Sequence, residues 1–213
     1  MKPLNKSHLK SIVELSDITL GKNFLSTSYF KQYVNSAKHI GLILEKEKEI
    51  IGFCLIDILT PEELKKTVLT NSSWFYDITK AYTKIALRKQ TVIHPKYKNL
   101  GYGTQLVNLA STFITTELEI STAWKHPNNV GMIKILLKNG FKLKKSIPNY
   151  WQTDSINKKY HCIICGMPPC QCSAEIYIKK KPFFMKGFFI PKLQLSVTSQ
   201  DTNSQLLKPQ FLL

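Results

Sequence analysis

The sequence predicts an α/β (α+β) domain in which strands and helices alternate along the chain. Two observations lead to this prediction. Apolar runs of strand length alternate with segments whose apolar residues recur at helical spacing. In addition, 43% of the 213 residues are apolar, enough to build the core of one domain with an appendage. No apolar run approaches the roughly 18 residues of a membrane span, so we expect a cytoplasmic protein with no membrane partner.

The first half of the chain is expected to form helices and then a hairpin. Residues 9–34 have a helical pattern with two interruptions. Residues 40–44 and 50–59 are apolar runs typical of strands, and the charged segment between them predicts a tight connection. Residues 61–69 are compatible with a short helix or a loop.

The second half is expected to alternate between strands and helices. The elements are strand 82–93, helix 103–116, strand 119–124, helix 129–139, strand 141–151 and strand 174–180. Each helix has an apolar stripe that we expect to be buried: Leu106, Val107, Ala110, Phe113 and Ile114 in the first, and Ile133, Leu136 and Leu137 in the second.

The charge of the chain is high and uneven. Thirty basic and 14 acidic residues give a net charge of +16. Residues 81–213 hold 19 basic and 5 acidic residues, against 11 and 9 in residues 1–80. This field repels polycations and argues against a polyamine- or aminoglycoside-binding cleft. It suits a nucleotide cofactor, an acidic protein surface or nucleic acid, although a lysine-rich surface that is simply solvated explains the same numbers.

The most informative segment is residues 92–104, VIHPKYKNLGYGT, in which a strand, a loop with two glycines and a helix follow one another. Gly101 and Gly103 allow a close approach that a Cβ atom would block. The main-chain N–H groups at the helix N-terminus and the helix dipole are suited to binding phosphate. Lys96 and Lys98 add positive charge.

This segment resembles the cofactor motif of the GCN5-related N-acetyltransferases, the GNAT superfamily. In that motif an apolar strand is followed by His-Pro, then Arg or Gln, two residues, Gly, one residue, and Gly or Ala; Lys98 stands at the Arg or Gln position. A second signature, an Asn that opens a helix ending in Gly-Phe, matches Asn129 to Phe141. The resemblance covers about residues 1–160 and the strand at Ala174. It implies a central mixed, mostly antiparallel sheet that is flanked by helices and splayed between its two central strands.

The resemblance also implies an acetyl-CoA site. Pantetheine would pair with the main chain of Val92 and Ile93, and Asn129 would contact the cofactor arm. A substrate amine would attack the thioester directly, in a ternary complex that removes much of the entropic barrier. The pyrophosphate would be held by the loop, that is by Lys98, Asn99, Leu100, Gly101, Tyr102, Gly103 and Thr104.

Two groups that are usual in the family are absent. Leu136 occupies the position of a tyrosine that protonates the leaving thiolate, and Trp124 occupies that of a glutamate base. His94 is a candidate base, with a loop histidine that fits the turn as the alternative. Tyr150 is a candidate proton donor, with core packing as the alternative. The resemblance further implies that Trp124 and Trp151 line the acceptor pocket.

Four of the five cysteines lie within eleven residues, in the pattern C-x2-C-x4-C-x-C. Cys162, Cys165, Cys170 and Cys172 match the tetrahedral demand of structural zinc, and disulfide or redox chemistry is the alternative. This insert, residues 161–173, joins the last two expected strands. In the family that connection overhangs the acceptor side, so the insert is expected to shape the choice of substrate.

The sequence therefore predicts an acetyl-CoA-dependent N-acetyltransferase domain over residues 1–181, followed by a partly loose extension over residues 182–213. The acceptor is expected to be a primary amine on an acidic protein or on an aminoacyl-tRNA. A homodimer is compatible with the apolar residues of the extension. Two alternatives remain: a protein that binds tRNA or DNA on the same scaffold, and a sensor that binds CoA without turnover.

Overall fold

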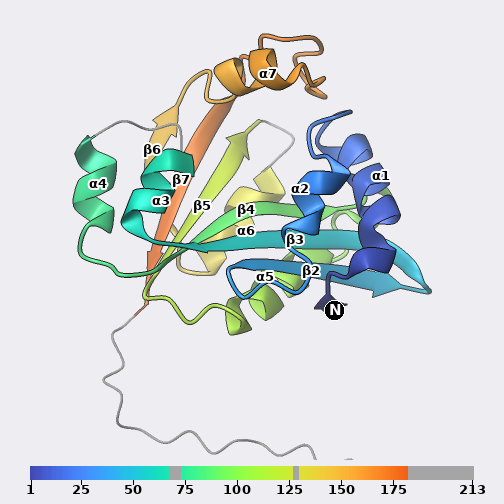
Figure 1. Cartoon of the computed structure of the whole chain (residues 1–213), viewed down its shortest axis with the longest axis horizontal. Coiled ribbons are helices and arrows are strands. Elements are labelled where there is room, and N and C mark those ends of the chain that lie inside the picture. The colour runs from blue at the N-terminus through green and yellow to red at the C-terminus, as the bar shows by residue number, and fades with distance from the viewer. Residues whose placement is uncertain (68–72, 127–129, 182–213) are drawn as a thin grey trace, which may run out of the picture. The chain divides into compact units, whose positions relative to one another are not determined.

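The computed structural model describes residues 1–67, 73–126 and 130–181, which form one sheet with helices on both of its faces (Figure 1). The seven strands lie in the order β1-β2-β3-β4-β5-β7-β6. All neighbours are antiparallel except β4 and β5, which are parallel. The predicted mixed, mostly antiparallel sheet is therefore confirmed. The expected extension 182–213 and Asn129 lie outside the described residues.

The strands agree with the sequence pattern in the centre of the sheet. Strands β2 and β3 form the expected hairpin, and β4 ends at Ile93, just before His94. The bounds are β1 Lys2–Pro3, β2 His39–Lys46, β3 Glu49–Leu59, β4 Ile85–Ile93, β5 Leu118–Lys125, β6 Lys142–Ile147 and β7 Ser173–Lys180.

Helices cover both faces because side chains of β3 alternate between them. Phe53 and Leu55 share a core with α1 and α2, whereas Cys54 and Ile56 share one with α5. Helix α6 lies on the face of α5, where its Leu136 contacts Ala123. The helices are α1 Leu9–Thr19, α2 Thr27–Lys31, α3 Pro61–Thr67, α4 Ser73–Thr79, α5 Tyr102–Thr112, α6 Val130–Lys138 and α7 Gln152–Lys158, with short 3-10 turns η1 Lys6–His8 and η2 Pro95–Tyr97. In the described part of the chain, no helix is long and apolar enough to cross a membrane.

The two central strands separate part-way along their length, as the resemblance implied. Strands β4 and β5 pair from Ile85 and Leu118 as far as Arg88 and Ser121, and the pairing ends there. Beyond that point β5 continues beside β7, and β4 continues beside β3. The sheet is therefore splayed between the ends of β4 and β5.

The expectations at three places were wrong. The strand expected over residues 141–151 ends at Ile147, because the chain turns and then forms α7. Phe113 and Leu137, each expected in an apolar stripe, are 47% and 52% exposed. Strand β1 and helices α4 and α7 were not anticipated. Each is seven residues or fewer, too short for a clear periodic pattern.

The packing of α6 gives a stability prediction. Leu136 is 1% exposed and contacts Ala123, Phe141 and Tyr177, so Leu136→Ala leaves a cavity. We expect it to lower the free energy of unfolding by about 2–5 kcal/mol, measured by urea denaturation. The matched control is Leu137→Ala on the next, exposed position, which we expect to change the free energy by less than about 0.5 kcal/mol. Equal losses in the two variants would contradict this packing.

Candidate active site

The loop between β4 and α5 presents an anion-binding helix end. Gly101 precedes α5 with a φ of 82°, and Asn99 also has a positive φ, of 63°. This path directs the chain into the helix so that its first N–H groups, which have no acceptor within the helix, point outward. The partial positive charge of a helix N-terminus adds to theirs. The loop predicted to hold a pyrophosphate therefore has the geometry for it.

Gly103 marks the place where β4, α5 and α6 come together. A Cβ atom on Gly103 would lie 3.1 Å from Cδ1 of Ile135 on α6 and 3.8 Å from Cγ1 of Ile93 on β4. The absent side chain keeps open the approach between the helix end and the strand. Leu100 in the same loop is 63% exposed, and Tyr102 packs edge-on against Tyr97.

The main chain of β4 is open on one side beyond the split. The N–H group of His94 donates to the carbonyl of Ile51 on β3, 2.8 Å away. Because main-chain groups alternate along a strand, Val92 also faces β3, where it pairs with Phe53. Ile93 and Thr91 therefore turn their N–H and C=O groups toward the side that β5 has left. Val92 and Ile93 were the two residues expected to pair with pantetheine, and only Ile93 faces the open edge. Thr91 also faces this edge, although the sequence did not indicate it.

A buried ion pair lies where the two strands separate. Both Nε and Nη2 of Arg88 contact Oε2 of Glu119, at 3.0 and 2.9 Å, and Nη2 also donates to Ser111 on α5. Lys181 lies 3.1 Å from the other carboxylate oxygen. Glu119 is therefore occupied in holding β4, β5 and α5 together, which argues against a role as the missing base.

Two tyrosines, Tyr29 in α2 and Tyr33 just after it, lie on the other face of the sheet, next to the split. The hydroxyl of Tyr29 donates to Oε1 of Gln90 on β4 at 3.5 Å and lies 3.3 Å from the hydroxyl of Tyr33. Burial raises the pKa of Tyr29 to about 12. Nearby, Nδ1 of His39 contacts Oδ1 of Asp57 at 2.9 Å. No sequence motif links these residues, because they come from α2, β2, β3 and β4.

This arrangement, a split parallel pair beside a glycine-containing loop at a helix N-terminus, agrees with a comparison of sequences. Residues 9–141, more than half of the chain, match the family model described as the Acetyltransferase (GNAT) family. The chain belongs to the GNAT acetyltransferases. The family assignment supports acetyl transfer as its general activity.

Solved GNAT structures share this fold at low sequence identity. NAA60 from Arabidopsis thaliana, in complex with a bisubstrate analogue, is 13% identical with a TM-score of 0.60, over 84% of this chain and 95% of that one. NAA60 in complex with acetyl-CoA is 14% identical with a TM-score of 0.59, over 84% and 96%. The ribosomal-protein-S18-alanine N-acetyltransferase from Escherichia coli is 12% identical with a TM-score of 0.59, over 89% and 97%. No curated protein sequence matches the chain.

The cysteine insert of this GNAT domain contacts the loop between α1 and α2. The N–H group of His161 donates to the carbonyl of Lys22 at 3.3 Å, and the rings of Tyr160 and Phe24 pack edge-to-face at 4.8 Å. A Cβ atom on Gly21 would lie 1.8 Å from the carbonyl oxygen of His161. The contact therefore requires glycine at that position. It places the insert and α7 above the face that carries α2 (Figure 1).

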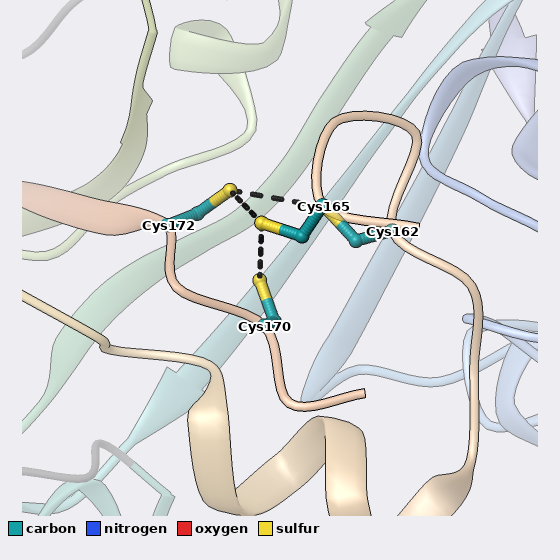
Figure 2. Close-up of side chains that lie close together, drawn as sticks. All are labelled: Cys162, Cys165, Cys170 and Cys172. Carbon is teal, nitrogen blue, oxygen red and sulfur yellow. Dashed lines mark hydrogen bonds between the residues drawn. The ribbon is translucent and has the colours of Figure 1, made fainter. Parts of the chain in front are cut away.

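The four clustered cysteines lie together as predicted (Figure 2). Their sulfur atoms are all within 4.8 Å of one another, with 3.4 Å between Cys165 and Cys172, 3.8 Å between Cys162 and Cys172, and 3.9 Å between Cys165 and Cys170. Four thiolates at ~2.3 Å from one zinc ion would be about 3.8 Å apart. The four sulfur atoms therefore fit a tetrahedral metal ion, and all four cysteines are free thiols.

The main chain around the cysteines forms a small hairpin, and Cys165 receives an N–H group that favours its thiolate. Cys162 and Gly166 exchange two hydrogen bonds of 2.9 Å, which closes a small hairpin around Cys165. The N–H group of Gln171 donates to Sγ of Cys165 at 3.4 Å. Burial raises the pKa of Cys170 to about 11, whereas at Cys165 the effect of burial is outweighed by the Gln171 N–H group and neighbouring thiols, which lower its pKa.

The aromatic residues expected in the acceptor pocket lie beside the cysteine cluster. The side chain of Trp124 on β5 hydrogen-bonds to Cys172 and its ring stacks on His126 at 5.3 Å. The N–H group of Tyr150 donates to the carbonyl of Cys172 at 3.0 Å. Trp151 precedes α7 and contacts Tyr150, with ring centres 4.9 Å apart. The insert therefore contacts Trp124 and Tyr150 directly, in both cases through Cys172.

Two further predicted residues have local roles in the structure. Nδ1 of His94 accepts the N–H group of Lys96 at 3.2 Å, so the histidine caps the turn η2. Leu136 points into the core. The helix position at which family members carry a proton-donating tyrosine therefore faces away from solvent in this chain. Cys54, the fifth cysteine, is fully buried in β3.

Proposed function

We propose that this GNAT acetyltransferase transfers the acetyl group of acetyl-CoA to a primary amine, by direct attack in a ternary complex. The split between β4 and β5 is the observation that carries the proposal. It leaves the main chain of Thr91 and Ile93 open next to the phosphate-binding helix end of α5. A ligand with a long amide-containing arm and a pyrophosphate complements both features at once, and acetyl-CoA is such a ligand.

In this proposal the pantetheine arm pairs with the open edge of β4. Ile93 and Thr91 offer main-chain groups, and Val92 lies between them with its own groups toward β3. The pyrophosphate binds the N–H groups of residues 98–104, with Lys98 as the nearby cation, and Asn129 contacts the arm. The complex of NAA60 with acetyl-CoA, a protein of the same fold, supports this choice of cofactor.

The reaction needs little beyond positioning and charge stabilisation. The amine attacks the thioester carbon, and a main-chain N–H group of the open edge, that of Thr91, stabilises the oxyanion. A thiol has a pKa near ~8.5, so the thiolate leaves without strong acid assistance. His94 through Nε2 and Tyr150 remain the candidate proton carriers, since the buried Leu136 carries no proton. Trp124 and Trp151 are proposed to line the acceptor side.

The acceptor that we favour is the free N-terminal amine of a protein with an acidic segment. One protein of the same fold acts, by its name, on the alanine of ribosomal protein S18. The excess of 14 positive charges in residues 81–213 attracts acidic chains. An aminoacyl-tRNA satisfies the same charge argument and is the alternative acceptor. Action in the cytoplasm and homodimer formation remain predictions.

We further propose that Cys162, Cys165, Cys170 and Cys172 hold one structural zinc ion. Zinc would neutralise four thiolates and tie β7 to the hairpin around Cys165. Main-chain hydrogen bonds hold the loop at Lys22 and Tyr150, and the hydroxyl oxygen of Ser155 accepts the N–H group of Cys170. The order of the loop would therefore determine the shape of the acceptor side. The cofactor loop is built from other elements, so the metal acts on acceptor binding and not on cofactor binding.

The proposed function is tested by CoA release in the presence of acetyl-CoA and a panel of peptides with acidic second and third residues. We expect thiol release with free N-termini and none when the same N-termini are blocked.

Gly103→Val places a branched side chain against Ile135 and Ile93, so acetyl-CoA affinity should fall at least tenfold by calorimetry, or about 1.4 kcal/mol.

The control for this variant is Leu109→Val, on a partly exposed position of the same helix, which should bind acetyl-CoA as the wild type does. Acetyl-CoA binding that is unchanged in a folded Gly103→Val protein would contradict the proposed cofactor site. Binding without thiol release on any peptide or aminoacyl-tRNA would favour the CoA sensor over the enzyme.

The zinc proposal predicts about one equivalent of zinc per chain in protein purified without chelator, measured by elemental analysis. Because thiol protons compete with the metal, the affinity should fall as the pH drops from 8 to 6. Cys165→Ser should increase proteolysis of the insert while acetyl-CoA affinity stays the same. A metal-free protein whose four thiols all react readily with a thiol reagent would rule the zinc site out.

A further inference from the structure

Lys89 is the extra residue of a β-bulge at the split of the sheet. Leu55 of β3 pairs with Gln90 and Ile56 pairs with Arg88, so Lys89 has no partner residue on β3. Arg88 reaches α5 on one face, and Gln90 contacts Tyr29 of α2 on the other. Lys89 lies within electrostatic reach of Asp57, Asp154 and Lys158. It therefore faces the side covered by α2 and α7, across the sheet from α5.

The ammonium group of Lys89 has no counter-ion. Within the described ranges, no carboxylate lies within ion-pair distance of its nitrogen, and no hydrogen bond joins it to a neighbour. Each acid nearby has another partner: Asp57 contacts His39 at 2.9 Å, and Asp154 contacts Lys158 at 2.8 Å. The other cation at the split, Arg88, forms an ion pair with Glu119 through Nη2 and Nε.

The surroundings make it easier for Lys89 than for an exposed lysine to lose its proton. The side chain is largely buried, and burial lowers its pKa because the charged form loses its water. The positive charge of Lys158 on α7 acts in the same direction, whereas Asp57 on β3 and Asp154 on α7 act against it. Tyr29 on α2 is neutral, since burial raises its pKa. Only the deprotonated amine is nucleophilic, and the lowered pKa of Lys89 increases the share of that form. Lys89 lies two residues along β4 from Thr91.

We propose that Lys89 is a self-acetylation site, modified by acetyl-CoA that is bound to the same chain. The inference rests on the proposed function, because the thioester must lie beside the open edge of β4. The lone pair of Nζ attacks the thioester carbon and forms the C–N bond. The C–S bond then breaks, CoA leaves as a thiolate, and the proton lost from nitrogen passes through solvent to that thiolate. The products are Nζ-acetyl-lysine and CoA.

Acetylation would change the acceptor side in two ways. It removes the positive charge beside Asp57 and Asp154, and it adds three heavy atoms to a side chain that is already largely buried. An acceptor amine present at the split would compete with Lys89 for the thioester. Self-acetylation would therefore be a reaction of the enzyme that lacks its acceptor.

The test uses the full chain with saturating trideuteroacetyl-CoA and no acceptor, and follows each lysine by peptide mass spectrometry. Lys158 is the internal control, because it is exposed and paired with Asp154. Chemical acetylation in solution modifies the exposed lysine first. We expect Lys89 to gain the label at least tenfold faster than Lys158, and to keep that lead as the pH is lowered. Tenfold dilution of the protein should leave the rate constant unchanged.

Two controls connect the label to the bound cofactor. Excess unacetylated CoA should slow the labelling of Lys89 and leave Lys158 unaffected, and Gly103→Val should do the same. Acetyl phosphate, which lacks the pantetheine arm, should show no preference for Lys89. Equal labelling of Lys89 and Lys158, or an equal preference with acetyl phosphate, would overturn the inference. Acetyl-CoA binding without Lys89 labelling overturns the inference alone, whereas absence of binding overturns the proposed function.

Discussion

Beyond Arg88, strand β4 carries main-chain groups that no described strand satisfies on the side of β5. Unpaired N–H and C=O groups at a strand edge bind a ligand that can replace the missing strand. The bulge at Lys89 and the buried pair of Arg88 with Glu119 fix where pairing stops. Breaking one member of a buried ion pair is strongly destabilising, so the position of the split is a firm feature of the fold. The proposed cofactor and oxyanion sites and the position of Lys89 all depend on this split.

The cysteine insert is a second constraint that acts on the opposite side of the same split. It contacts the α1–α2 loop through His161 and supports Trp124 and Tyr150 through Cys172. The first of these contacts joins Lys22 and His161, which are more than 130 residues apart in the sequence. A metal held by four thiolates would make this arrangement independent of a large apolar core. In the proposed function the two constraints have separate roles, since the split would bind the cofactor and the insert would shape the acceptor side.

The sequence predicted the features that are local. The glycines of the loop, the hairpin β2–β3 and the four cysteines are each contained in a short segment, and the structure confirms their proximity. It could not predict contacts that depend on register. The open edge at Thr91, the bulge at Lys89 and the tyrosines of α2 result from how strands pair, which a periodic pattern does not specify. The expected strand ran on to Trp151 because Ile147, Tyr150 and Trp151 are apolar, and α7 was missed because it has only seven residues.

Amide hydrogen exchange resolved to single residues, with and without acetyl-CoA, tests the split-edge account most directly. The N–H groups of Thr91 and Ile93 face the open edge, whereas that of Val92 is bonded to β3 in either state. The account predicts that acetyl-CoA slows exchange at Thr91, Ile93 and the first turn of α5, and leaves Val92 unchanged. Protection by acetyl-CoA that spares Thr91 and Ile93, or that appears only on another strand, would contradict it.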